Sequence, residues 1–324
     1  CNKKLQFINL FIMNPKVSML VPAFKDSYLS QSINSLLSQT YDNFSITVVD
    51  DASPNNIEGI VKSFSSDRLK YYRNPQNIGG HNLVANWNSM LKYAEDADLV
   101  VLASDDDIYH PAFLSTLVNL SLKYPSVDLF HCRVGVIDGQ NNPIHWGASI
   151  AEFESDIDFI YQRAVNRRTQ LISDFMFRRT ALMNIGGFTD YPKAWHSDEM
   201  TVYKIARGKG VVCSQETLFF WRSSNQNISS RISDLKEKAI ATDLHRSEMR
   251  EFIKSLVPHT QRDEFLHQQL KARCSQEIER QLIYDMLKAP FFKALAIFKK
   301  YPYLRTSKWM LKFTEGHIRR LLGT

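Results

Sequence analysis

Residues 99–107 read LVVLASDDD, a short apolar run that ends in three consecutive aspartates. A run this short and rich in Val and Leu is typical of a strand buried on both faces. Three adjacent carboxylates repel one another unless a cation lies among them, and Mg²⁺ and Mn²⁺ prefer such hard oxygen ligands. Aspartate also favours solvated turns and helix N-caps, and Pro111 indicates a helix start. Taken alone, the triplet therefore leaves a metal site and a plain turn open.

Strands and helices alternate over the first hundred residues. Apolar runs rich in β-branched residues predict strands, and apolar residues at helical spacing predict helices. The predicted strands are 17–21, 44–49, 70–73 and 99–103, and the predicted helices are 29–39, 55–65 and 83–94. This alternation is typical of a mostly parallel sheet with helices on its faces.

Polar clusters come directly after three of these strands. They are the loop at residues 22–25, the pair Asp50 and Asp51, and the triplet at residues 105–107. In parallel sheets, ligands bind outside the carboxyl ends of the strands. We therefore expect two acidic clusters and one loop to line a single crevice.

The pattern changes along the rest of the chain. A strand is expected at 130–137, a tight turn at 186–188, a helix from Asp198 through Ile205, and closing strands at 211–213 and 218–221. From about residue 234, glycine is absent until Gly316 and long helical patterns take over. We place a domain boundary near residue 232.

Composition sets the class of protein. The 324 residues are 44% hydrophobic and 23% charged, which is ordinary for a soluble globular protein with one large domain and a smaller appendage. The four cysteines show no CxxC spacing, which argues against a zinc knuckle or redox motif and fits a reducing cytoplasm. No GxxxxGK[ST] motif supports a P-loop. Residues 1–12 are too short and polar for a membrane span, and Met13 resembles a natural start.

The basic character of the chain belongs to its last part. The net charge is +6, yet from residue 288 onward nine Lys and Arg side chains face one acidic residue, Glu315. Aromatic and aliphatic residues alternate with these cations, which suits an interfacial helix on an anionic membrane surface. A helical subdomain or a homodimer face fits the pattern equally well. Nucleic acid is not expected as a partner, because the remainder is slightly acidic and carries no recognition motif.

Several motifs follow one another in a fixed order. Residues 15–24 read PKVSMLVPAF, residues 35–41 SLLSQTY, residues 48–53 VVDDAS, residues 104–111 SDDDIYHP and residues 185–188 IGGF. In this order they resemble the motifs of the family 2 glycosyltransferases, of the bacterial surface-polysaccharide type, over roughly residues 15–230. The resemblance implies an α/β protein with a GT-A, Rossmann-like, mostly parallel sheet flanked by helices and a C-terminal helical extension. The expected layout is a leader, or residues foreign to the natural chain, at 1–14, a GT-A domain at 15–232 and a basic helical region at 233–324.

The resemblance also implies an activity. It predicts an inverting, metal-dependent glycosyltransferase that moves a sugar from a nucleotide-diphosphate donor to a hydroxyl of a glycan or lipid-linked acceptor. Asp198 would be the general base, and Asp106 would hold Mn²⁺ or Mg²⁺ with help from Asp105 or Asp107. Residues 221–229 resemble a loop that closes over the diphosphate. We expect the protein in the cytoplasm, and the basic tail leaves a peripheral position on the inner face of the cell membrane open.

The remaining site residues also come from the resemblance. Those expected at the nucleotide are Pro22, Ala23, Phe24, Asp50, Asp51, Asp105 and Arg222. His196 and Glu199 are candidates for a metal or acceptor contact. Plain alternatives exist: Asp50 and Asp51 as turn residues, Asp198 as a helix N-cap, and His196 as a structural histidine.

Two departures from the family pattern keep rival functions open. Ser104 stands where the family often has the first aspartate of its motif, and Trp87-Asn88 replaces a frequent Arg-Asn pair. These changes allow a non-catalytic pseudo-enzyme that binds nucleotide sugars. A sugar-phosphate nucleotidyltransferase would carry a glycine-rich loop with Arg and Lys after the first strand, where only Lys25 occurs. A receiver-type signalling domain also clusters aspartates around Mg²⁺, but it is much smaller.

Overall fold

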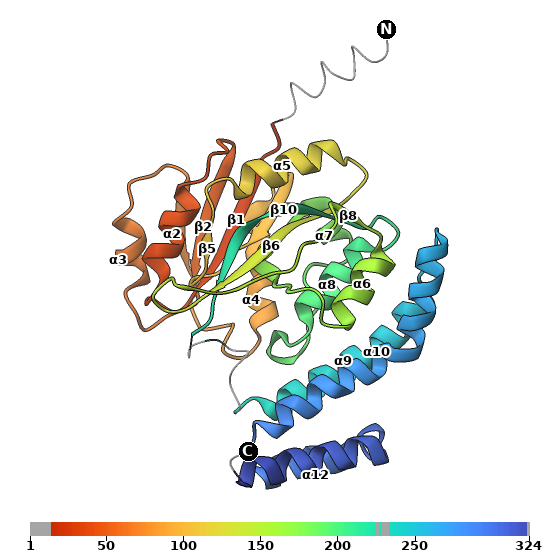
Figure 1. Cartoon of the computed structure of the whole chain (residues 1–324). Helices are drawn as coiled ribbons and strands as arrows, with labels where there is room; N and C mark the ends of the chain where they lie inside the picture. Colours follow the sequence, from red (N-terminus) through yellow and green to blue (C-terminus); the bar gives the residue numbers. More distant parts are fainter. Residues whose placement is uncertain (1–13, 225–226, 228–232, 323–324) are drawn as a thin grey trace. The chain divides into compact units, whose positions relative to one another are not determined.

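The computed structural model describes residues 14–224, 227 and 233–322, and Figure 1 traces the chain. It forms two compact units. The first comprises Cys1–Asp190 and Ser197–Ser224, and the second comprises Tyr191–His196 and Asn225–Thr324. All but the last residue of the predicted leader, and the predicted boundary near residue 232, lie outside the described residues.

A single mixed sheet forms the centre of the first unit. Its order is β3-β2-β1-β4-β9-β6-β10-β5, with β7 beside β6 and β8 beside β10. Pairing is parallel from β3 to β4 and between β6 and β10, and it is antiparallel at the other contacts. The strands are β1 Val17–Ala23, β2 Phe44–Asp50, β3 Leu69–Arg73, β4 Leu99–Leu102, β5 Ile108–Tyr109, β6 Leu129–Ile137, β7 Pro143–Trp146, β8 Phe153–Glu154, β9 Phe175–Arg178 and β10 Val211–Arg222.

Helices connect these strands and flank the sheet, as Figure 1 shows. They are α2 Leu29–Leu37, α3 Ile57–Lys62, α4 Leu83–Met90, α5 Phe113–Lys123, α6 Asp156–Ala164, α7 Arg179–Asn184 and α8 Ser197–Ala206, with 3-10 turns η1 Leu91–Ala94 and η2 Ile172–Asp174. Side-chain caps begin several of them: the side chain of Asn56 accepts from Gly59 N at α3, and that of Asn82 accepts from Ala85 N at α4. The alternation of strand and helix predicted up to residue 102 is confirmed.

The core explains why the central strands read as continuous apolar runs. Side chains alternate between the two faces of a strand. On β1, Met19 and Val21 belong to one cluster with Ile33 of α2 and Leu117 of α5. Leu20 points to the opposite face and is fully buried as well. Both faces of the sheet are therefore covered at β1, which leaves its carboxyl end as the place where polar side chains can gather.

One strand differs from the prediction. Residues 211–213 and 218–221 belong to a single strand, β10, rather than to two. The polar residues between them, Ser214, Gln215 and Glu216, resemble a turn in sequence, but shifts in the register against β6 at Thr217 keep the strand continuous. As a result β10 reaches Arg222 without a break.

The second unit is helical. Its elements are η3 Pro192–Ala194, α9 Leu235–Lys254, α10 Gln261–Leu287, α11 Phe291–Lys300, η5 Pro302–Leu304 and α12 Ser307–Leu322. α9 and α10 run side by side (Figure 1). Met286 of α10, Phe298 of α11 and Trp309 of α12 share one apolar cluster. Among the described residues, no helix combines the length and the apolar character that a membrane crossing requires.

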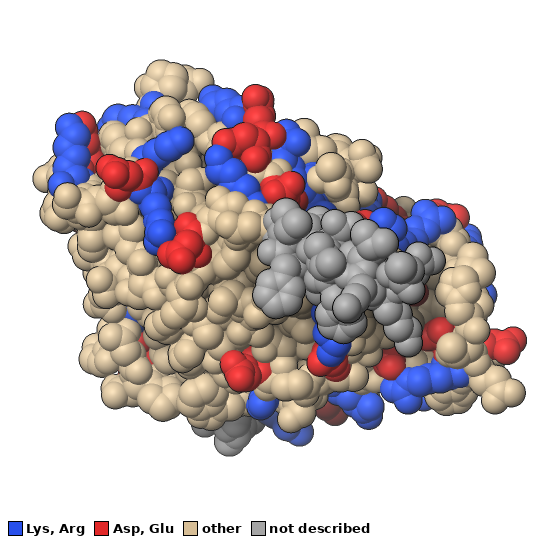
Figure 2. Space-filling view, turned by 90° about the horizontal axis from the view of Figure 1, so that it is seen from above, with Lys and Arg blue, Asp and Glu red and all other residues tan. Residues whose placement is uncertain are grey.

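Acidic and basic side chains are mixed on part of the surface. Figure 2 shows Lys and Arg interspersed with Asp and Glu over the face that it displays, and no large region of that face carries charges of one sign only.

The turn at Gly186 and Gly187 offers a matched pair of substitutions. Both glycines have positive φ angles, of 84° and 90°. A Cβ on Gly187 would lie 2.5 Å from Asn88 Oδ1, whereas one on Gly186 meets nothing within 4 Å. We expect Gly186→Ala to lower the free energy of unfolding by about 1 kcal/mol through backbone strain. Gly187→Ala should cost about 2 kcal/mol more, because it also displaces the Asn88 side chain from its hydrogen bonds with the backbone of Phe188.

Urea denaturation of the two variants measures this difference. Equal losses in both would show that the hydrogen bonds between Asn88 and Phe188 contribute nothing to stability.

Candidate active site

The aspartate triplet lies directly beyond the carboxyl end of β4 and is buried. Asp105 Oδ2 accepts hydrogen bonds from the backbone N–H groups of Phe24, at 3.0 Å, and Lys25, at 2.9 Å. These two residues follow Ala23, the last residue of β1. The triplet and the predicted loop at residues 22–25 are therefore brought together as the sequence predicts.

A lysine ammonium lies between two of the carboxylates. Lys25 Nζ is 3.3 Å from Asp105 Oδ1 and forms an ion pair with Asp106 Oδ2. Burial lowers the pKa of Lys25, but Asp105 and Asp106 raise it above its ordinary value. Burial in turn raises the pKa of Asp105 against the lowering effect of Lys25. The carboxylates of Asp105 and Asp106 thus converge on one cation.

Both carboxylate oxygens of Asp107 accept hydrogen bonds. Ser104 Oγ donates a hydrogen bond to Oδ2, and the backbone N–H of Arg222 donates to Oδ1 at 2.8 Å. Burial and the nearby charge of Asp106 raise the pKa of Asp107 to about 7. Ser104, which occupies the place of a family aspartate, is therefore a hydrogen-bond donor to the triplet and spares it a fourth negative charge.

Arg222 is fully buried and fixes the backbone of the triplet. Its Nε donates to the carbonyl oxygen of Asp106 at 2.7 Å. Its guanidinium carbon lies 4.1 Å from the centre of the Tyr28 ring. The terminal nitrogens donate to Asp138 O, Asn141 Oδ1 and Gln31 Oε1. Arg222 positions the turn that carries Asp106; its predicted contact with the nucleotide stays a prediction.

Asp50, the last residue of β2, is held by a guanidinium and a phenol. Asp50 is fully buried, and its Oδ1 accepts from Ser53 N at 2.7 Å. Its Oδ2 accepts from Tyr71 Oη at 2.8 Å and from Arg73 Nη1. Tyr71 and Arg73 come from the neighbouring strand β3.

Asp51 organises the loop before α4. Its carboxylate accepts from Asn74 Nδ2 at 2.8 Å, from Ile78 N at 2.9 Å and from Gly79 N at 2.6 Å. Asn77 Nδ2 donates to the same carboxylate at 3.1 Å. These contacts give Asp51 a structural role, and its predicted place at the nucleotide stays a prediction.

The predicted base is in the first turn of α8. Asp198 is half-buried there, beside Glu199. Glu199 Oε1 pairs with Arg163 Nη2 of α6 at 2.8 Å. Burial lowers the pKa of Arg163, but Glu199, Tyr203 and Asp198 raise it above its ordinary value. Two carboxylates thus lie near one half-buried guanidinium at the start of α8, where the helix dipole favours negative charge.

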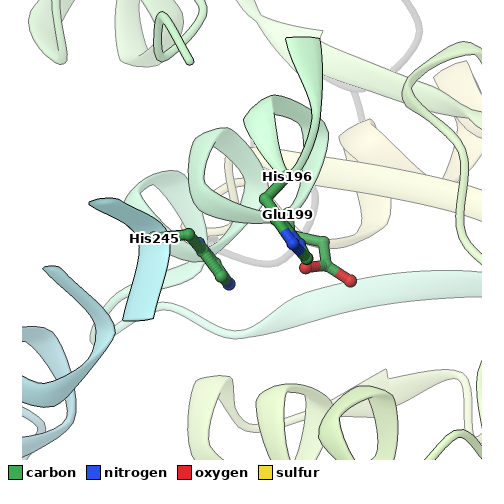
Figure 3. A group of neighbouring side chains, drawn as sticks. All are labelled: His196, Glu199 and His245. Carbon is green, nitrogen blue, oxygen red and sulfur yellow. The ribbon is translucent and has the colours of Figure 1, made fainter. Parts of the chain in front are cut away.

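His196 belongs to the second unit. Its ring stacks on that of His245 of α9, with centroids 4.4 Å apart, and Figure 3 shows the two rings side by side. His196 Nε2 also lies 3.2 Å from Thr242 Oγ1. Glu199, the third residue labelled in Figure 3, is part of the first unit. His245 could not be predicted as a neighbour of His196, because it lies inside a regular helical pattern.

The residues that stand in place of the family's Arg-Asn pair hold the Gly186-Gly187 turn, which follows α7. The ring of Trp87 meets that of Phe188 edge to face at 5.9 Å. The Asn88 side-chain amide exchanges two hydrogen bonds with the backbone of Phe188, at 2.8 and 3.0 Å. This contact joins α4 to the Gly186-Gly187 turn.

The acidic cluster suits a divalent metal by its chemistry. Asp105 and Asp106 present carboxylate oxygens that already bind a cationic group, and Mg²⁺ and Mn²⁺ prefer ligands of this kind.

Sequence comparisons identify the family. A model described as "Glycosyl transferase family 2" matches residues 18–188, more than half of the chain. An uncharacterized glycosyltransferase of Rickettsia typhi is 24% identical over 238 residues, 69% of each chain. Over 91 residues, 28% of this chain and 35% of the relative, the identity is 36% to the UDP-Glc:alpha-D-GlcNAc-diphosphoundecaprenol beta-1,3-glucosyltransferase WfgD of Escherichia coli.

Solved structures confirm the predicted GT-A fold. TarS of S. aureus, residues 1–349, in complex with UDP-GlcNAc superposes with a TM-score of 0.65 at 15% identity, over 95% of this chain and 92% of that one. A mannosyltransferase of Pyrobaculum calidifontis in complex with GDP-Man and Mn²⁺ gives a TM-score of 0.55 at 15% identity, over 96% and 88%. The chain therefore belongs to glycosyl transferase family 2, and it is an enzyme that transfers a glycosyl group from a nucleotide sugar.

Proposed function

We propose that the chain is an inverting, metal-dependent glycosyltransferase that acts on a hydroxyl of a lipid-linked glycan. The observation that carries the proposal is the convergence of the Asp105 and Asp106 carboxylates on one cation at the carboxyl end of β4. Ligands bind at this edge in parallel sheets.

The donor is bound by the residues at the ends of β1, β2 and β4. Asp106 is the principal ligand of Mn²⁺ or Mg²⁺, and Asp105 shares that role while it holds the backbone of Phe24 and Lys25. The metal supplies positive charge where the leaving diphosphate becomes more negative. Asp50, fixed by Tyr71 and Arg73, contacts the base or ribose.

The acceptor hydroxyl is deprotonated by Asp198. Inversion by a single in-line displacement requires one general base and no enzyme nucleophile. A half-buried carboxylate at a helix start suits this role, because the helix fixes its position. Glu199, which is paired with Arg163, is less available as a base.

The choice of donor and acceptor classes draws on the relatives. TarS was solved with UDP-GlcNAc and the Pyrobaculum enzyme with GDP-Man, so both UDP-sugars and GDP-sugars are donor candidates. WfgD is named for transfer to GlcNAc-diphosphoundecaprenol, a lipid-linked acceptor. We infer an acceptor of the same class here.

An acceptor of this class brings the enzyme to a membrane surface, and the second unit fits an anionic one. Phe292 of α11 is 82% exposed and Leu311 of α12 is 61% exposed. Lys299, Lys308 and Arg319 are exposed on the same two helices, whose region carries nine basic residues against one acidic residue. Apolar groups among cations are typical of interfacial helices on anionic lipid. We place the protein on the inner face of the cell membrane.

The base assignment predicts the outcome of a conservative substitution. Asp198→Asn should lower the transfer of labelled sugar from the active donor to membrane-extracted acceptor by a factor of at least about 100, the lower end of the range for a general base. UDP or GDP should still raise the melting temperature in the presence of Mn²⁺. Asp67→Asn, a change at an exposed carboxylate before β3, is the control and should keep full activity. Full activity in Asp198→Asn would rule out the assignment.

The membrane contact predicts selective loss of vesicle binding. Burying a Phe or Leu side chain contributes about 1.5–3 kcal/mol each, so Phe292→Gln with Leu311→Gln should weaken partitioning by at least about tenfold. Co-sedimentation with phosphatidylglycerol-containing vesicles measures the effect, and high salt should weaken wild-type binding. Phe265→Gln is the matched control, because Phe265 is 59% exposed on α10.

Unchanged binding of the double variant would contradict the membrane contact. A homodimer in sedimentation equilibrium that the double variant dissociates would assign this surface to a second copy of the chain instead.

A further inference from the structure

Lys25 contacts the triplet through two separate parts of the residue. Its backbone N–H donates to Asp105 Oδ2 at 2.9 Å, next to the equivalent bond from Phe24. Its ammonium pairs with Asp105 Oδ1, at 3.3 Å, and with Asp106 Oδ2. The backbone anchor does not depend on the ammonium, so the side chain can leave the carboxylates while the loop stays in place.

The ammonium of Lys25 occupies the same carboxylate oxygens that a divalent metal would need as ligands. Two unit charges about 4 Å apart repel by about 4 kcal/mol at the effective dielectric constant near a protein surface, and a divalent ion doubles this term. A metal bound to Asp106 is therefore incompatible with the ammonium of Lys25 at its present place. The side chain is 29% exposed, and its flexible four-carbon stem allows it to move.

We propose that Lys25 is a tethered cation that holds Asp105 and Asp106 in the metal-free enzyme. When the donor binds, the ammonium of Lys25 moves to oxygens of the donor's diphosphate and leaves these carboxylates to the divalent metal. The inference rests on the proposed function, since it takes Asp106 as a metal ligand.

Exchange of the Lys25 ammonium for the divalent metal couples the binding of the metal to the binding of the donor. Without a diphosphate, the metal has to displace a paired ammonium and leave it without a partner, so it binds weakly. With a diphosphate present, the ammonium gains new oxygens and the metal binds more tightly. By linkage, the metal must raise the affinity for the nucleotide by the same factor.

Binding of Mn²⁺ alone tests the competition, with electron paramagnetic resonance of the free ion as the readout. Lys25→Met and Lys25→Gln remove the ammonium and should bind Mn²⁺ at least about tenfold more tightly than the wild type, within the usual range of coupling. Lys25→Arg keeps the charge and should resemble the wild type. Lys62→Met, which removes an exposed ammonium paired with Glu58, is the matched control.

The outcomes distinguish a wrong metal ligand from a wrong role of Lys25. If Asp106→Asn binds Mn²⁺ as the wild type does, Asp106 is not a metal ligand and the proposed function loses its metal site. If Asp106→Asn abolishes binding while both neutral Lys25 variants match the wild type, only the role of Lys25 is overturned. Should Lys25→Met fail to fold, Lys25→Gln carries the same test.

A second titration addresses the link to the donor. UDP and GDP serve as probes, and the more effective of the two should raise the Mn²⁺ affinity of the wild type at least about tenfold. The rise should be much smaller in Lys25→Gln. An equal rise in both proteins would overturn the donor-linked movement of Lys25.

Discussion

The burial of three consecutive carboxylates at the end of β4 is the constraint on which the first unit depends. Burying unpaired charges costs several kcal/mol each, so donors must come to them. They come from the loop after β1, through Phe24 and Lys25, from the adjacent Ser104, and from the end of β10 at Arg222. Segments up to two hundred residues apart are thereby fixed around one short turn.

The sequence predicted the part of this arrangement that follows from local pattern. Strand ends in a parallel sheet meet at one edge, so placing Asp50 and Asp105 after buried apolar runs was enough to predict that they lie at one edge. The partners of Arg222 could not be predicted. Tyr28, Gln31 and Asn141 are distant along the chain, and only the tertiary fold brings them to the guanidinium.

The two departures from the family pattern have structural explanations that weaken the rival functions. Ser104 supplies a hydrogen bond to Asp107, and Trp87 packs on Phe188. Neither change removes the carboxylates of the site, so neither requires a pseudo-enzyme. The family match is to glycosyl transferases, which leaves no support for a nucleotidyltransferase or a receiver domain. The polar residues inside β10 also have a structural explanation, since a bulge allows polar residues inside a strand.

Two cations act on the triplet, and they act on different parts of it. Arg222 binds a main-chain carbonyl from a fully buried place, whereas Lys25 binds carboxylate oxygens from a partly exposed one. The Arg222 side chain is packed among residues from several segments, so it can change during evolution only together with the residues around it. The side chain at position 25 is partly exposed, so it can change with less disturbance of the scaffold. If Lys25 has the role that we propose, a single substitution there would change the dependence on metal.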